Sequence, residues 1–398
     1  MKILQLCKKF PFPIKDGEAI AITNLARALQ QLGCELTLLC MNTPKHYFDP
    51  EDLPAHFNYY QAIHTIDVDT NLRASAALAN LFSTQSYHIV RFVSPAFEKK
   101  LIDLLNTQSF DVIQMETLYL APYSPVIRQH SEAKIAMRAH NVEYEIWQRI
   151  AQNTVFLPKK WYLNYLTGKL RHFEQSALVH YDLLVPITQR DLQHFQQMGS
   201  QQKALTTPIG IDAARYQPHA QSFQHALSLS FIGSLDWMPN QEGLQWFLRE
   251  VWPALHQRYP NLSLHVAGRN PPDWMLQMER ENIVVHGEVP SAPDFINQHS
   301  LMIVPLLSGS GMRVKILEGM ALGKVVLTTS VGLEGIDAQH QQEVLIADCV
   351  EEWLACFDFC LHNEDRLPII GRQARQLIEQ RYDNQRIAQK LLKAYHQL

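Results

Sequence analysis

The sequence predicts an α/β protein built from two doubly wound units, each with a mainly parallel sheet. Three observations support this prediction. Short apolar runs of strand length alternate with helix-like segments through the first half of the chain. The same alternation starts again at Leu229, after a polar stretch without periodicity at 219–225. Finally, the segment Leu301–Gly335 reads as strand, small-residue turn, helix and strand in direct succession.

Length and composition limit the possible functions. The chain has 398 residues, which is enough for two or three domains with separate cores. Its 35 basic and 39 acidic residues show no basic excess, so we expect no nucleic-acid partner. The apolar part of the first thirteen residues is too short for a signal peptide, and no run approaches eighteen apolar residues. We therefore expect a cytoplasmic protein.

The cysteine and histidine patterns argue against disulfides and metals. Six cysteines are scattered without a CxxC pair, and Cys7, Cys34 and Cys40 lie in or beside strand-like runs. They are expected to be buried, reduced thiols. No HExxH motif and no Cys/His cluster has ligand spacing among the 18 histidines, so we expect no metal site.

The first half of the chain contains the elements of one α/β unit. The expected strands are 2–7, 35–41, 110–115, 134–137 and 183–187, and the expected helices are 19–32, 144–150, 155–178 and 188–195. Gly17 falls on the loop after the first strand, at the edge where open α/β sheets bind their ligands. It is a candidate ligand contact. A plain strand–helix connection is the alternative, because no GxGxxG fingerprint is present.

Two further features of this half suggest a function. His140 and Asn141 follow the strand expected at 134–137, where a histidine can contact a ligand or a transition state, or can be a structural hydrogen-bonding group. The stretch 155–178 mixes cations with aromatic residues: Lys159, Lys160, Trp161, Tyr162, Tyr165, Lys169 and Arg171. Such a helix suits an anionic membrane surface. The alternative is a solvated helix whose aromatic side chains face the core.

The best domain boundary lies near residue 207, before a second alternation of strands and helices. We expect domains at 1–207 and 208–380, with a final amphipathic helix in 381–398 that packs back on the first domain. In the second domain the first strand ends at Gly233. The second strand is followed by Arg269, which is either a pyrophosphate contact or a member of a surface ion pair.

The segment from Leu301 to Gly335 contains the strongest candidate site. A buried strand at 301–307 is followed by Ser308–Gly311, and a helix is expected over 312–322. The turn leaves N–H groups from Gly311 to Arg313 at the positive end of the helix dipole, where an anion such as a pyrophosphate binds well. Glu318 lies further along the helix, where its carboxylate is suitably placed to accept hydrogen bonds from a ribose. An ordinary βαβ unit with a solvated glutamate is the alternative.

Several of these segments together resemble the retaining family-4 glycosyltransferases of the GT-B fold, and the resemblance covers nearly the whole chain. The matching segments are 309–321, 331–335, 231–234, 208–212 and 138–143. The resemblance implies two Rossmann-like domains facing across a cleft, with the acceptor on the first and a nucleotide-sugar on the second. It implies donor contacts at Gly17, Gly233, Arg269, Gly311, Met312, Arg313, Lys315 and Glu318, and catalytic positions at His140, Ser310 and Glu318.

Two departures from the family pattern leave alternatives open. The family commonly has a second glutamate eight positions before the one that matches Glu318, with seven residues between them, and its place is taken here by Ser310. The basic pair often found after the first strand of the second domain is also missing. Arg269, Arg313 and Lys315 are the candidates for supplying the positive charge instead, and the choice among them is open. A catalytically silent nucleotide-sugar-binding protein and a nucleotide-sugar epimerase are the alternatives to a transferase.

The activity implied by the resemblance is retaining, metal-independent transfer of a sugar from a nucleotide-diphosphate sugar, without a cofactor, in polysaccharide biosynthesis. The acceptor is a glycan, a lipid-linked molecule or a small molecule. No pair of carboxylates suggests a glycosidase-like double displacement. We therefore expect the leaving phosphate to accept the acceptor's proton. Peripheral attachment to the inner face of the membrane is left open.

Overall fold

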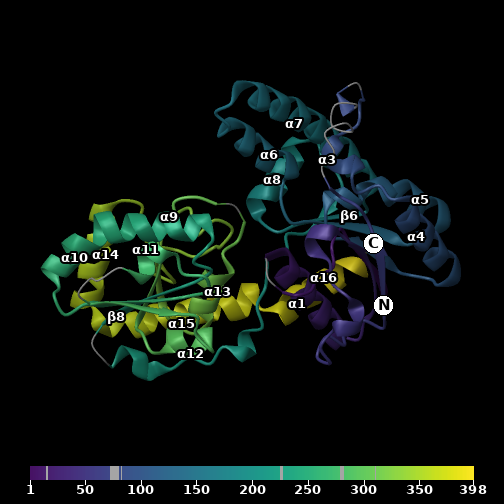
Figure 1. Cartoon of the computed structure of the whole chain (residues 1–398). Helices are drawn as coiled ribbons and strands as arrows, with labels where there is room; N and C mark the ends of the chain where they lie inside the picture. The colour runs from purple at the N-terminus through teal and green to yellow at the C-terminus, as the bar shows by residue number, and fades with distance from the viewer. Residues whose placement is uncertain (15–16, 72–79, 82, 225–226, 278–281, 310) are drawn as a thin grey trace. The chain divides into compact units, whose positions relative to one another are not determined.

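The computed structural model describes residues 1–14, 17–71, 80–81, 83–224, 227–277, 282–309 and 311–398. The chain divides into two compact units. The first consists of Met1–Gly210 together with Ile387–Leu398, and the second of Ile211–Arg386. Figure 1 shows strands and helices alternating along both units.

The first unit is built on a parallel sheet, which has seven strands among the residues described. Their order is β3 (Ala62–Asp67), β2 (Glu35–Asn42), β1 (Lys2–Cys7), β4 (Val112–Met115), β5 (Lys134–Ala139), β6 (Leu183–Pro186) and β7 (Lys203–Ala204). The helices include α1 (Gly17–Gln31), α3 (Tyr87–Val90), α4 (Pro95–Thr107), α5 (Ser124–His130), α6 (Glu143–Gln152), α7 (Leu157–Ala177) and α8 (Gln189–Gln197). The order of the strands reverses between β1 and β4, which marks the expected ligand edge.

The last helix, α16 (Asn384–Tyr395), contributes to the core of the first unit. Its buried Ile387, Leu391 and Tyr395 belong to the same apolar cluster as Ile3 and Leu25. Burying a leucine or isoleucine side chain is worth about 1.5–3 kcal/mol. These contacts place the end of the chain in the first unit. Cys7, Cys34 and Cys40 are buried and free, as expected.

The second unit repeats the same winding in a parallel sheet with six described strands. Their order is β10 (Ile283–Gly287), β9 (Ser263–Ala267), β8 (Ser228–Ile232), β11 (Leu301–Val304), β12 (Val325–Thr328) and β13 (Leu345–Ile346). Its helices include α9 (Met238–Trp246), α10 (Trp252–Arg258), α11 (Asp273–Leu276), α12 (Ala292–Asn297), α13 (Val314–Ala321), α14 (Val350–His362) and α15 (Leu367–Leu377). Here the strand order reverses between β8 and β11. None of the helices in the described part of the chain has the length and apolar character needed to span a bilayer.

The structure corrects several expected boundaries. The strand expected over 301–307 ends at Val304, and the helix expected from Met312 begins at Val314. Gly309 and Gly311 both have positive φ angles, +111° and +83°, so the backbone between strand and helix stays a loop. Strand β3 was missed because its residues are only partly buried and do not alternate cleanly. Helices α4 and α14 were also missed.

Candidate functional site

The loop between β11 and α13 supports the strongest candidate site of the second unit. We call Gly233, Asn240, Arg313 and Lys315 the basic cradle. Gly233 follows β8, Asn240 lies in α9, and the two cations flank the start of α13. Since all strands of the sheet are parallel, Gly233 and the loop after β11 share its carboxyl edge.

Lys315 is positioned by the backbone at Gly233. Its Nζ donates to Asn240 Oδ1 at 2.7 Å, and Asn240 Nδ2 donates in turn to the Ser234 carbonyl at 2.8 Å. A Cβ built on Gly233 would lie 2.7 Å from Lys315 Nζ, so any side chain there would displace the ammonium group. Burial lowers the pKa of Lys315 to about 7; the charge of Arg313 lowers it further and Glu318 opposes the shift. The negative charge near Lys315 is therefore too weak to offset its burial, and a bound anion would stabilise the ammonium form.

Arg313 stabilises the loop itself. Its side chain is buried, and Nη1 donates to the Gly311 carbonyl. A Cβ on Gly309 would lie 3.0 Å from its Nη2, which is a second reason for a glycine at that position. The guanidinium lies 5.9 Å from the centre of the Trp237 ring. Burial lowers the pKa of Arg313, and Glu334 opposes this. The residue supports the loop backbone as well as adding positive charge.

Glu318 lies in α13, three residues beyond Lys315. Its Oε1 accepts a hydrogen bond from Tyr216 Oη at 2.9 Å. Burial raises the pKa of Glu318, against the opposing effects of Tyr216 and Lys315. Arg375 fixes this arrangement, because its Nη1 donates to the carbonyls of Tyr216 and Ala321 at 2.6 Å each. Sequence reasoning missed Tyr216, which lies 102 residues before its partner and belongs to no motif.

The other predicted donor contacts are distributed unevenly. Met312 is buried in the loop, whereas Arg269 is exposed after β9, at the same edge of the sheet as Gly233. Ser310 lies outside the described residues. Gly17 belongs to the first unit, and it is the first residue of α1 rather than a loop residue, because the helix begins two residues earlier than expected. The structure therefore brings together Gly233, Lys315 and the 309–313 loop.

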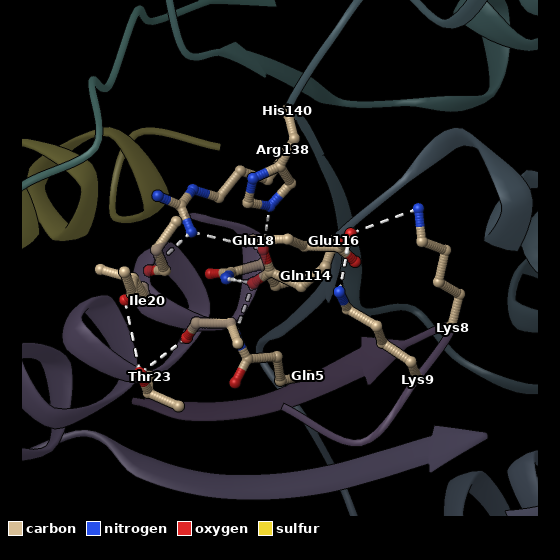
Figure 2. Close-up of polar contacts among 12 residues, drawn as sticks. Gln5, Lys8, Lys9, Glu18, Ile20, Thr23, Gln114, Glu116, Arg138 and His140 are labelled. Carbon is tan, nitrogen blue, oxygen red and sulfur yellow. Dashed lines mark hydrogen bonds and ion pairs between the residues drawn. The ribbon is translucent and has the colours of Figure 1, made fainter. Parts of the chain in front are cut away.

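In the first unit, the carboxyl ends of β4 and β5 meet at a buried carboxylate (Figure 2). Glu116 Oε2 accepts from His140 Nε2 at 2.9 Å and lies 3.4 Å from Arg138 Nη1. The side-chain amides of Gln5 and Gln114 donate to Oε1. Burial alone would raise the pKa of Glu116, but the charge of Arg138 and the His140 hydrogen bond lower it to about 2. The group is thus an anion at neutral pH.

This network also orients His140. An ionised carboxylate can only accept, so the His140 nitrogen facing Glu116, Nε2, carries a proton. Nδ1 is then the ring atom left for another partner. The side chain lines a small cavity together with Asn141, Glu143 and Thr117. His140 is therefore an oriented histidine at the ligand edge of the sheet. Its bond to Glu116 is also the contact that a purely structural hydrogen-bonding histidine would make.

Further charged groups of the first unit escaped the sequence analysis. Glu18, at the start of α1, pairs with Lys8 and Lys9 at 3.3 and 3.5 Å (Figure 2). Glu174 accepts from the backbone N–H groups of Glu143 and Tyr144, which start α6. Both carboxylates are recognisable only once the helices are placed. Among the described residues, no three His, Cys, Asp or Glu side chains are grouped to hold a metal ion.

Comparison with known proteins identifies a family domain within the second unit. Residues 226–363 match the family model for glycosyl transferases group 1. This segment is a group 1 glycosyl transferase domain. It contains the whole basic cradle and Glu318, whereas Tyr216 lies just before it. The chain therefore carries a glycosyltransferase domain, as the resemblance implied.

Solved structures match the whole chain. HepE of Anabaena in complex with UDP covers 100% of both chains with a TM-score of 0.68 at 12% identity. Sucrose-phosphate synthase of Thermosynechococcus elongatus covers 100% of this chain and 99% of its own, with a TM-score of 0.68 at 14% identity. These matches, together with the two doubly wound sheets, confirm the GT-B fold class.

A curated relative extends the comparison to sequence. An uncharacterised 44.6 kDa protein in the cps region of Klebsiella pneumoniae is 22% identical over an alignment of 310 residues, and the match covers 74% of this chain and 76% of the relative. This match reaches well beyond the group 1 domain.

The buried network around Glu116 can be tested through stability. Glu116→Gln removes the charge that compensates Arg138, and we expect it to lower the free energy of unfolding by about 3–5 kcal/mol. Adding Arg138→Met should restore part of that loss, because it removes the uncompensated cation. Chemical denaturation of the unaltered chain and the two variants measures both effects. Equal stability of Glu116→Gln and the unaltered chain would contradict the role assigned to the carboxylate.

Proposed function

We propose that this protein transfers a sugar, with retention of configuration and without a metal, from a nucleotide-diphosphate sugar to an acceptor hydroxyl. The observation that carries the proposal is the position of Lys315. The residue belongs to the first turn of α13, and its Nζ lies against Gly233 at the carboxyl edge of the sheet. An ammonium group and free helix N–H groups are the groups that stabilise a departing diphosphate.

The transfer step requires little from the protein beyond binding and charge stabilisation. The bond between the anomeric carbon and the diphosphate oxygen breaks, a bond to the acceptor oxygen forms, and the acceptor's proton passes to the leaving diphosphate. Lys315 and the α13 N–H groups stabilise the negative charge that develops on the diphosphate. Glu318, oriented by Tyr216, accepts hydrogen bonds from the ribose.

The comparisons suggest which substrates to test first. HepE of Anabaena forms complexes with UDP and with UDP-glucose, so UDP-sugars are the first candidate donors. The Klebsiella relative is a cps-region protein, which supports the expected role in polysaccharide biosynthesis. The acceptor is then a growing glycan, a lipid-linked intermediate or a small molecule. Screening UDP-sugars by thermal shift identifies the donor, since a ligand at 100 times its dissociation constant adds about 2.7 kcal/mol.

Glu318→Gln tests the ribose contact. We expect donor affinity to fall by about ten-fold or more, because the amide loses a charge-assisted acceptor worth about 1.5–3 kcal/mol. The melting temperature should stay unchanged. Tyr216→Phe is the matched variant: it keeps the carboxylate but frees its orientation, so its loss of affinity should be smaller. Calorimetry with the donor decides, and unchanged affinity in Glu318→Gln would make that residue structural.

The lowered pKa of Lys315 predicts that donor binding depends on pH. The amine is largely neutral above its pKa of about 7, and a bound diphosphate favours the ammonium form. Donor binding should therefore take up a proton above pH 7, and affinity should fall by up to about ten-fold per pH unit there. UDP-glucose is the right probe, because its diphosphate, unlike the terminal phosphate of UDP, does not titrate near neutral pH.

Two methionine variants provide the controls for this titration. Lys315→Met should bind weakly and with little pH dependence. Lys324→Met should keep the pH dependence, although burial also lowers the pKa of Lys324, to about 8. Lys324 precedes β12 and so lies at the opposite, amino edge of the same sheet. A pH dependence retained in Lys315→Met would assign the titration to another group.

His140→Ala separates an enzyme from a silent binding protein. His140 belongs to the first unit and every group of the cradle to the second. We expect turnover to fall about ten-fold or more while donor affinity changes less. Calorimetry beside a transfer assay measures both. Donor binding without transfer in the unaltered protein would favour the silent protein, and an altered nucleotide-sugar released as product would favour an epimerase.

A further inference from the structure

Helices α6 and α7 of the first unit form a hairpin whose turn lies away from the sheet (Figure 1). Residues 153–156 connect the two helices. The inner face of α7 is an ordinary core face, since Leu163, Leu166 and Leu170 are buried. These leucines pack in the core, whereas other apolar side chains of the hairpin do not.

A second set of apolar side chains lies at the turn and is exposed. We call it the tip patch. Its members are Val155, Phe156, Leu157 and Trp161, with exposed fractions of 92%, 67%, 75% and 66%. Exposed large apolar side chains are common singly, but a contiguous group that includes two aromatic rings marks an interaction surface.

The charge around the tip patch has one sign. Between Ile146 and Phe173 the chain contains no Asp or Glu, although the whole chain has a formal net charge of −4. The basic residues in this interval are Arg149, Lys159, Lys160, Lys169 and Arg171. Lys160 and Lys169 donate to backbone carbonyls of Gln152 and Asn80, whereas Lys159 is exposed beside the patch. The acidic residue on α6 nearest to this interval, Glu145, is paired with Arg190.

We propose that the tip patch docks this protein on an anionic lipid surface. A bilayer interface presents negative phosphates above apolar chains, and the tip presents apolar side chains flanked by cations with no acid among them. Phe156 and Trp161 are the kind of side chains that enter the headgroup region, while Lys159 stays at the level of the phosphates. The charge complementarity favours this occupant over a second copy of the chain, whose tip would be equally basic.

Vesicle flotation of the full chain tests the proposal without donor or acceptor. Binding should be strong on phosphatidylcholine vesicles containing phosphatidylglycerol, weak on phosphatidylcholine alone, and reduced by salt. Phe156→Ser with Trp161→Ser should lower the partition coefficient by about ten-fold or more. Both side chains are exposed, so the double variant should keep the melting temperature of the unaltered chain.

Matched variants elsewhere on the first unit provide the controls. Val179→Ser alters an apolar side chain that is 70% exposed near the other end of α7, and it should leave binding unchanged. Lys159→Glu should weaken binding to anionic vesicles, whereas Lys99→Glu, on exposed α4 surface, should have little effect. The blue shift of tryptophan fluorescence on vesicles should shrink in Trp161→Phe.

Three results would overturn the proposal. They are equal vesicle binding by the tip variant and the unaltered chain, equal binding to neutral and anionic vesicles, and a tip-dependent dimer in sedimentation without lipid. The last result would make the tip an interface between copies. None of them bears on sugar transfer, which calorimetry with the donor measures separately. The docking surface and the proposed activity can therefore fail independently.

Discussion

The first unit depends on a carboxylate that is completely removed from water. Glu116 is tolerated there only because Arg138, His140 and two glutamine amides surround it. The network extends outward, since Arg138 donates to the Ala21 carbonyl in α1 and Tyr395 of α16 donates to Gln114. Removing any single partner leaves a buried polar group without compensation. A sheet, the first helix and the last helix are thereby held together around one charge.

The second unit treats the partly buried charge of Lys315 differently. Lys315 has one neutral acceptor, Asn240, as its recorded hydrogen-bond partner, and its pKa is lowered instead of its charge being matched. The charge of Glu116 is thus compensated by partners within the chain itself. The ammonium form of Lys315, in contrast, would be stabilised most by an anion from outside the chain. This contrast fits the proposed roles, because a framework must be stable alone and a binding site must gain from its ligand.

The sequence predicted local features well and distant partners poorly. Strand runs, the glycine-rich turn and the positions of His140 and Glu318 follow from apolar periodicity and from the ends of strands. Tyr216, Glu116 and Glu174 act through residues far along the chain, and a pattern read over a short window contains no information about them. The start of α13 was misplaced for a local reason, because Gly309 and Gly311 take positive φ angles that prolong the loop.

Lysines of the second unit show why a perturbed pKa alone does not define a site. Burial lowers the pKa of both Lys315 and Lys324. Lys324 is fully buried, donates to Ser222 and precedes β12, at the amino edge of the sheet. Lys315 is partly exposed at the carboxyl edge, beside a glycine whose missing side chain leaves its ammonium room. Lys315 therefore lies at the edge where open α/β sheets bind their ligands, and Lys324 lies at the opposite edge. The location in the fold, and not the pKa shift, distinguishes the candidate functional lysine.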